Sequence, residues 1–255
     1  MRKFVRSVQV HFPFLQNAQF AIKRWYQRVT GIPFEADFNA LALFPDEPGM
    51  VYLDVGANRG LSTDAILTKT RNSRVILFEP NARVGHRLRR MYAHHPRVTV
   101  YAIGLGEETG RYSLYVPCYR RWSFDSLGSM SEVHARDWLK DALYFYNERR
   151  LTVRRQPCAV KPLDSLNLKP FFIKLDVQGH ELAVLKGGLQ TLRRHEPVLL
   201  VEAPDAEVTE YLAAFGYEPY AYERGRFKAG VMGKLNTFYM TPAKAALAAK
   251  HIDRS

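Results

Sequence analysis

Short apolar runs alternate with amphipathic segments along most of this chain. Five runs have the length and the valine, isoleucine and leucine content of buried strands, at residues 51–55, 75–80, 98–104, 171–177 and 198–204. Helical spacing of apolar residues follows four of these runs, at residues 62–70, 82–94, 182–192 and 208–215. This alternation predicts an α/β fold with a mostly parallel sheet. A last run, at residues 235–240, predicts an antiparallel strand that closes the edge of that sheet.

Three segments depart from the alternation, and we expect them to decorate a single domain with its core at residues 50–242. Residues 1–49 form a basic helical extension, in which residues 17–31 predict an amphipathic helix capped by Asn17 and ended by Gly31. Residues 111–155 predict an insertion made of a hairpin strand, an aromatic loop and a helix. The alanine-rich residues 243–255 predict a dispensable tail.

The residues after the first predicted strand indicate a ligand-binding turn. Asp54 stands at the carboxyl end of the strand, where open α/β sheets bind ligands. Gly56, Ala57, Asn58 and Gly60 follow, and the two glycines allow the backbone to bend sharply against a ligand. The middle glycine of a dinucleotide-binding loop is missing. An acidic residue before such a loop favours a ligand with a positive amine and no phosphate, and S-adenosylmethionine has this chemistry.

The second and third predicted strands end in residues that suit a nucleoside. Glu79 lies 19 positions after Gly60, the spacing expected for a carboxylate that binds both ribose hydroxyls. Glu79 is alternatively an acid that caps the helix beginning after Pro80. Pro80 itself is a further candidate for contact with the cofactor. Ala102 and Ile103, past the third strand, are placed to line the adenine, although any core also supplies an apolar strand end.

The segment IKLDVQGHE, at residues 173–181, carries the second cluster of candidate residues. Lys174 and Asp176 point to the same face of a strand and end near Asp54. Two charges in an apolar central strand are costly to bury unpaired, so we expect them to pair and to serve a functional site. Asp176, His180 and Glu181 are the candidates for a general base, and His180 is alternatively a solvent-facing residue at a helix start.

Six segments in this order resemble the FkbM family of S-adenosylmethionine-dependent methyltransferases. They span residues 50–240 and read LDVGANRG, FEPN, PLDSL, IKLDVQGHELAVLKG, LVEAP and NTFYM. The resemblance implies a Rossmann-like class I methyltransferase fold and methyl transfer to a hydroxyl of a sugar, glycolipid or natural product. It also implies cofactor contacts from Asp54, Gly56, Asn58, Gly60 and Glu79. Gln178 stands where many relatives have Glu, and the residue at position 180 varies among them.

The chemistry of methyl transfer suggests roles for the second cluster. In-line displacement needs an aligned acceptor oxygen, and a base assists as the hydroxyl loses its proton. We expect Asp176 or His180 to take that proton, with Lys174 as the partner of a carboxylate. A divalent ion held by Asp176 and Glu202 is an alternative activator, but two carboxylates are weak evidence for a metal, and we predict none.

The insertion offers candidates for acceptor binding. Aromatic side chains are interleaved there with arginines, and Arg120, Arg121 and Trp122 are adjacent. Aromatic faces stack on sugar rings, and arginines bind carboxylate or phosphate. We therefore expect an acidic or phosphate-linked glycan or glycolipid acceptor. The alternative is that the aromatic residues form a small core of the insertion itself.

Composition and charge limit the partners. The 255 residues carry a formal net charge of +12, which attracts phosphate, anionic lipid or acidic glycan. No RNA-binding module is recognisable, so no nucleic acid partner is expected, with an RNA methyltransferase kept as an alternative. Cys118 and Cys158 lack metal-ligand spacing, which favours a reduced, cytoplasmic location.

The extension adds one further possibility. Residues 1–34 hold basic residues and no acidic one, so the predicted helix is suited to a peripheral contact with the anionic inner face of a membrane. The alternative is a helix packed on the core with a solvated basic face. A protein that binds the cofactor at the membrane surface without catalysis is the remaining alternative. The sequence leaves the oligomeric state open.

Overall fold

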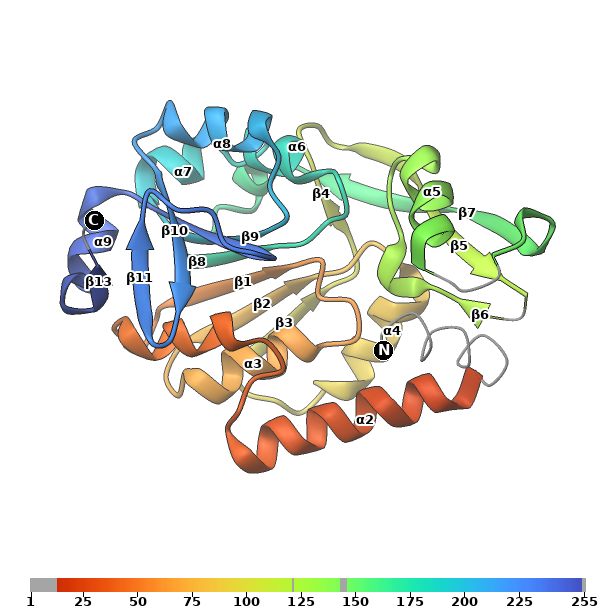
Figure 1. Ribbon diagram of the computed structural model, residues 1–255, viewed down its shortest axis with the longest axis horizontal. Helices are drawn as coiled ribbons and strands as arrows, with labels where there is room; N and C mark the ends of the chain where they lie inside the picture. Colours follow the sequence, from red (N-terminus) through yellow and green to blue (C-terminus); the bar gives the residue numbers. More distant parts are fainter. Residues whose placement is uncertain (1–12, 121, 143–145, 254–255) are drawn as a thin grey trace.

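A long, mostly parallel sheet forms the centre of the molecule (Figure 1). The computed structural model describes residues 13–120, 122–142 and 146–253. Within these ranges the central sheet has the strand order β13-β11-β10-β12-β9-β8-β1-β2-β3. The strands from β9 to β3 in that order pair in parallel, which confirms the predicted α/β, Rossmann-like fold. Their bounds are β1 Val51–Val55, β2 Arg74–Phe78, β3 Val98–Tyr101, β8 Pro170–Leu175 and β9 Val198–Glu202.

Helices cover both faces of the sheet, as the alternation predicts (Figure 1). α3 and α4 lie on one face, with α2 outside α3, and α6, α7 and α8 lie on the other. The predicted helix at residues 182–192 is two helices, since the chain turns at Gly187 and Gly188. The bounds are α2 Pro13–Thr30, α3 Leu61–Lys69, α4 Ala82–Met91, α6 Glu181–Lys186, α7 Leu189–His195 and α8 Ala206–Ala213.

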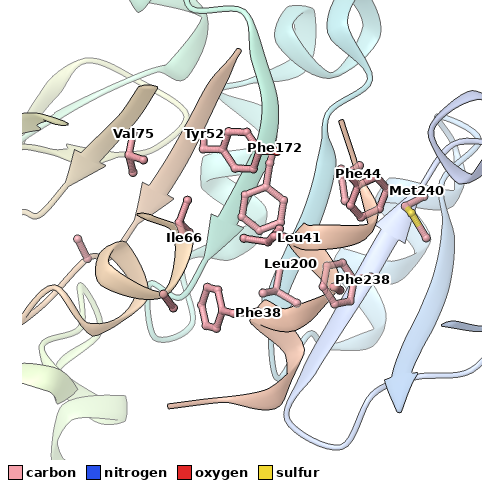
Figure 2. Close-up of a cluster of buried hydrophobic side chains, with 14 of the residues drawn as sticks. Phe38, Leu41, Phe44, Tyr52, Ile66, Val75, Phe172, Leu200, Phe238 and Met240 are labelled. Carbon is pink, nitrogen blue, oxygen red and sulfur yellow. The ribbon is translucent and has the colours of Figure 1, made fainter. Parts of the chain in front are cut away.

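Alternate residues of each strand enter two separate cores. On β1, Tyr52 packs in the cluster under α3, and Leu53 packs in the cluster under α6 to α8. Figure 2 shows the first cluster, in which Phe38 and Leu41 of the 3-10 helix η1 (Ala36–Leu43) meet side chains of the strands. The same alternation places Asp54, Lys174 and Asp176 on the α3 side, where they continue the row of Tyr52 and Phe172 toward the carboxyl ends.

The insertion builds a second sheet with the order β4-β7-β5-β6 in the described part of the chain. It runs beyond the predicted 111–155, because β5 is long and β4 pairs with the end of β7. α5 packs against this sheet (Figure 1). The bounds are β4 Gly104–Leu105, β5 Gly110–Tyr119, β6 Trp122–Ser123, α5 Glu132–Ala142 and β7 Leu151–Lys161.

The end of the chain differs from its prediction. β12 is antiparallel as expected, but it lies between β9 and β10 and is buried throughout, so it does not close the edge. The predicted tail is not dispensable, since Ala245 and Ala248 enter the core and β13 pairs with β11. The bounds are β10 Glu218–Glu223, β11 Arg226–Ala229, β12 Asn236–Met240, α9 Pro242–Leu247 and β13 Ile252–Asp253.

The amino-terminal helix begins earlier than predicted. α2 starts at Pro13, so Asn17 lies inside the helix and is not its cap. The predicted end is correct, because α2 ends at Thr30 and Gly31 has a φ of 68°, the left-handed conformation that glycine favours after a helix. In the described residues, no helix is long and apolar enough to cross a membrane.

Candidate active site

The carboxyl ends of β1, β2 and β8 border a pocket with about 600 Å³ of empty space, a volume that includes its opening to solvent. Six of the predicted site residues line it, namely Gly56, Asn58, Glu79, Pro80, Asp176 and His180. The other lining residues are Val55, Phe78, Gly104, Leu105, Leu114, Asp125, Gly128, Met130, Val177 and Gln178.

The two glycines after β1 are required by the protein itself. Gly56 has a φ of 82°, and a Cβ there would lie 1.8 Å from the backbone oxygen of Asp176. Gly60 has a φ of 80°, and its Cβ would lie 2.8 Å from the hydroxyl of Tyr92. The glycines therefore let the loop pack against β8 and α4, whereas the sequence suggested close approach to a ligand.

Besides Asp54, which is described below, four of the predicted cofactor residues lie away from the pocket lining. Ala57 is buried in the core cluster under α3. Gly60 faces Tyr92, and Ala102 lies against Gly85 of α4. Ile103 packs on the cluster under α6 to α8. Their contacts with a cofactor stay predictions.

Glu79 is a buried carboxylate at the end of β2. One oxygen accepts a hydrogen bond from the backbone N–H of Asn58 at 2.8 Å, and the other accepts one from the N–H of Asn81 at 2.8 Å. Asn81 caps α4 with its own side chain, so Glu79 is not the helix cap. Burial raises the pKa of Glu79 to about 7, although the two backbone donors act in the opposite direction. The carboxylate thus joins the first loop to the second and faces the pocket.

Lys174 is the partner of two carboxylates, as the spacing predicted. Its Nζ lies 3.0 Å from Oδ2 of Asp176 and 3.7 Å from Oδ1 of Asp54, and it donates to the backbone oxygen of Gly56 at 3.2 Å. Burial acts to lower its pKa, but the carboxylates of Asp176 and Asp54 raise it. Because its pKa is raised, the ammonium group stays charged. Lys174 is not one of the residues that line the pocket.

Asp54 lies behind the pocket rather than in its wall. Its Oδ2 accepts hydrogen bonds from the hydroxyls of Ser62 at 2.8 Å and Thr63 at 2.6 Å, both in the first turn of α3. Asp54 thus ties β1 to α3 and holds Lys174. Its predicted direct contact with the cofactor stays a prediction.

Gln178 joins the ends of β8 and β9. Its Nε2 donates to Oδ1 of Asp176 at 2.8 Å and to Oε2 of Glu202 at 3.0 Å. Burial and the neighbouring Asp176 raise the pKa of Glu202 to about 9. Burial would also raise the pKa of Asp176, but Lys174 lowers it. The two acids are therefore held in different protonation states.

Strained backbone marks the same loops. Asn58, Gln178 and Ala203 follow β1, β8 and β9, and each has a φ between 42° and 54°. A non-glycine residue in this conformation costs about 1–3 kcal/mol and persists where the surroundings impose it, often at functional sites.

The side chains of the two residues at the start of α6, His180 and Glu181, face in different directions. His180 lines the pocket, and burial lowers the pKa of its imidazole. Glu181 turns away, because its Oε1 accepts a hydrogen bond from the N–H of Val177 at 3.0 Å and closes the turn. Among the candidate bases, His180 and Asp176 therefore face the pocket and Glu181 does not.

The insertion forms a wall of the pocket with residues other than the predicted ones. Trp122 is only 2% exposed and packs with Tyr119, Phe124 and Leu127 in a small core, which is the alternative weighed for these aromatic residues. Arg120 is exposed at the β5–β6 turn, and Arg121 lies outside the described residues. The wall consists of Leu114, Asp125, Gly128 and Met130.

An acidic group next to the site was not anticipated. Asn236 of β12 donates to Oε2 of Glu35 at 3.0 Å and to Oδ2 of Asp37 at 2.9 Å. Burial raises the pKa of both acids. Their distance along the chain from β12 left no signal in the sequence. No group of three or more His, Cys, Asp or Glu residues suited to a metal occurs in the described part of the chain.

The fold and the pocket define a Rossmann-like domain with a candidate ligand site at the ends of its parallel strands. The family model for the methyltransferase FkbM domain matches residues 54–219, more than half of the chain. The chain therefore belongs to this family of methyltransferases.

Individual relatives are distant. The chain is 25% identical over 172 residues to the 2-O-methyltransferase NoeI of Sinorhizobium fredii, covering 65% of this chain and 68% of NoeI. It is 29% identical over 193 residues to the AMB antimetabolite synthetase AmbE of Pseudomonas aeruginosa, covering 63% of this chain and 9% of the synthetase. A crystal structure of methyltransferase FkbM from Methylobacillus flagellatus KT shares the fold, with a TM-score of 0.51 and 19% identity over 82% of this chain and 47% of that one.

The cofactor of this methyltransferase is S-adenosylmethionine. The pocket suits it, because a carboxylate at the end of β2 faces the space that a nucleoside needs. In addition, Oδ1 of Asn58 is buried at the pocket with no hydrogen-bond partner among the described residues. A buried acceptor atom of this kind fits a donor group of a ligand, such as the amine of the cofactor.

Proposed function

We propose that the protein is an O-methyltransferase whose acceptor is a hydroxyl of a sugar, glycolipid or natural product. One observation carries the proposal. Asn58 and Glu79, the candidates for cofactor binding, line the same pocket as Asp176 and His180, the candidates for proton transfer. The name of the relative NoeI, a 2-O-methyltransferase, supports an oxygen acceptor.

Gly56, Asn58 and Glu79 would hold the cofactor, with Glu79 accepting from the ribose hydroxyls. The bound cofactor supplies an electrophilic methyl group. The chain then has to place a hydroxyl in line with it and accept the proton released when the oxygen–carbon bond forms.

We propose that His180 accepts this proton. Burial lowers the pKa of His180, so its imidazole is neutral and able to accept a proton near pH 7. Asp176 is less suited, since its two oxygens already accept from Lys174 and Gln178 and its pKa is lowered. Asp176 instead orients the acceptor hydroxyl.

Two variants test these roles. His180→Gln should lower kcat/KM by about 10²- to 10⁴-fold with unchanged cofactor affinity. In the wild type, kcat/KM should fall as the pH drops below the lowered pKa of His180, and the variant should lose this dependence. A normal rate in His180→Gln, with a large loss in Asp176→Asn, would move the base to Asp176.

The activity itself is tested with a panel of acceptors. We expect purified protein and S-adenosylmethionine to add one methyl group to a hydroxyl of an oligosaccharide, glycolipid or hydroxylated natural product, detected by mass spectrometry. RNA is included as a second substrate class. Methylation of RNA with no methylation of the hydroxyl panel would overturn the proposal.

A further inference from the structure

α2 packs on the protein with its polar side and leaves its apolar side in solvent. Gln27 is 1% exposed and donates from Nε2 to the backbone oxygen of Leu61 at 3.1 Å. Its Oε1 accepts from the N–H of Phe34 at 2.8 Å. Nε of Arg24 lies 2.6 Å from Oδ2 of Asp64 in α3, and Nη2 of Arg28 lies 2.9 Å from Oδ1 of the same residue. This reverses the usual arrangement of a surface helix, whose apolar stripe faces the core.

The outward side is a continuous apolar stripe. Ile22, Trp25, Tyr26 and Val29 follow each other at helical spacing and are exposed by 64%, 65%, 48% and 64%. Ile32 and Phe34, just after the helix, are exposed as well. An exposed patch of large apolar residues on one face indicates a contact surface rather than chance exposure. We call Ile22, Trp25, Tyr26 and Val29 the outer stripe.

Charge decides what the outer stripe contacts. Lys23 is exposed beside the stripe, and Arg28 borders its other side with a half-exposed side chain. Residues 1–34 contain six Lys or Arg and no Asp or Glu. Aromatic and aliphatic side chains between basic ones are the features of a helix that lies in the interface of an anionic bilayer.

We propose that α2 docks the protein on anionic membrane lipid through the outer stripe. The ion pairs of Arg24 and Arg28 with Asp64 hold the helix in this orientation, so the stripe is presented without any rearrangement. Ile22, Trp25 and Val29 enter the acyl boundary, and Lys23 meets lipid phosphate. The proposal is independent of the methyl acceptor.

Vesicle flotation tests the docking with the full chain. The wild type should float with vesicles of phosphatidylglycerol and phosphatidylcholine, and bind less to phosphatidylcholine alone. Trp25→Ser should lower the partition coefficient by about tenfold, because one large side chain no longer leaves water. Lys23→Gln should lower it by about fivefold on the anionic vesicles alone.

Val133→Ser is the matched control, since Val133 of α5 is also 64% exposed but lies outside the stripe. It should bind as the wild type does. Equal binding by Trp25→Ser, or no binding of the wild type to anionic vesicles, would overturn the proposal. A wild-type dimer in sedimentation that Trp25→Ser converts to a monomer, without vesicle binding, would assign the stripe to a second copy and also overturn it.

Discussion

The two walls of the pocket are built in different ways. The wall formed by the ends of β1, β2 and β8 depends on close backbone packing and buried charges, with Gly56 against Asp176 and Lys174 between two carboxylates. The wall formed by the insertion depends on an aromatic cluster around Trp122. The first arrangement tolerates few residue types at each position, whereas packed side chains can be exchanged if volume is kept. Under the proposed function, the first wall would hold the cofactor, and the second would be free to suit an acceptor.

The largest effect is expected from Gly56→Ala. The new Cβ would overlap the backbone oxygen of Asp176, so the loop or β8 must shift, and we expect a loss of about 4 kcal/mol or more in the free energy of unfolding. Gly216→Ala is the control, because Gly216 has a similar φ of 77° and no atom within 4 Å of its Cβ. It should cost about 1–2 kcal/mol from strain alone. If both variants lost a similar free energy of unfolding, measured with urea, the close packing at Gly56 would be unimportant.

The second prediction uses Trp122→Ala to test whether the two walls act independently. Removing the ring leaves a cavity in the small core, with a cost of about 3 kcal/mol confined to the insertion. Cofactor affinity by calorimetry should change by less than about threefold, since Trp122 is not among the described residues that line the pocket. Turnover with the acceptor should fall by more. Arg120→Gln in the same hairpin is exposed and should leave both unchanged. Equal losses of cofactor affinity and turnover in Trp122→Ala would mean that the walls are not independent.

The smallest effect concerns pH and the first wall. Burial raises the pKa of Glu79 from 4.5 to about 7, so the folded protein keeps this proton to a higher pH than the unfolded chain does. The free energy of unfolding should therefore fall as the pH rises from about 4.5 to about 7, by up to about 3 kcal/mol. Glu79→Gln should lack this part of the pH dependence and bind the cofactor less tightly. If the free energy of unfolding, measured with urea, changed with pH in the same way in the wild type and in the variant, this pH dependence would not come from Glu79.

Sequence patterns anticipated the first wall better than the second. Period-two strands and their polar ends predicted that Lys174 would pair with Asp176, and the structure brings them to 3.0 Å. The close packing of Gly56 against Asp176 was not predicted, because a left-handed glycine looks the same in sequence whether a ligand or a strand approaches it. Trp122 had two interpretations, and only its burial in the cluster decides between them.

The sequence by itself determined the parallel sheet, the loop after β1 and the family motifs, because all of these depend on local periodicity and on residues close together in the chain. The tertiary structure decided the contacts between distant segments. It brought Glu35 and Asp37 to Asn236, placed β12 inside the sheet, and turned the polar side of α2 toward Asp64. An amphipathic pattern fixes two faces of a helix, but only the partner across the interface determines which of them is buried.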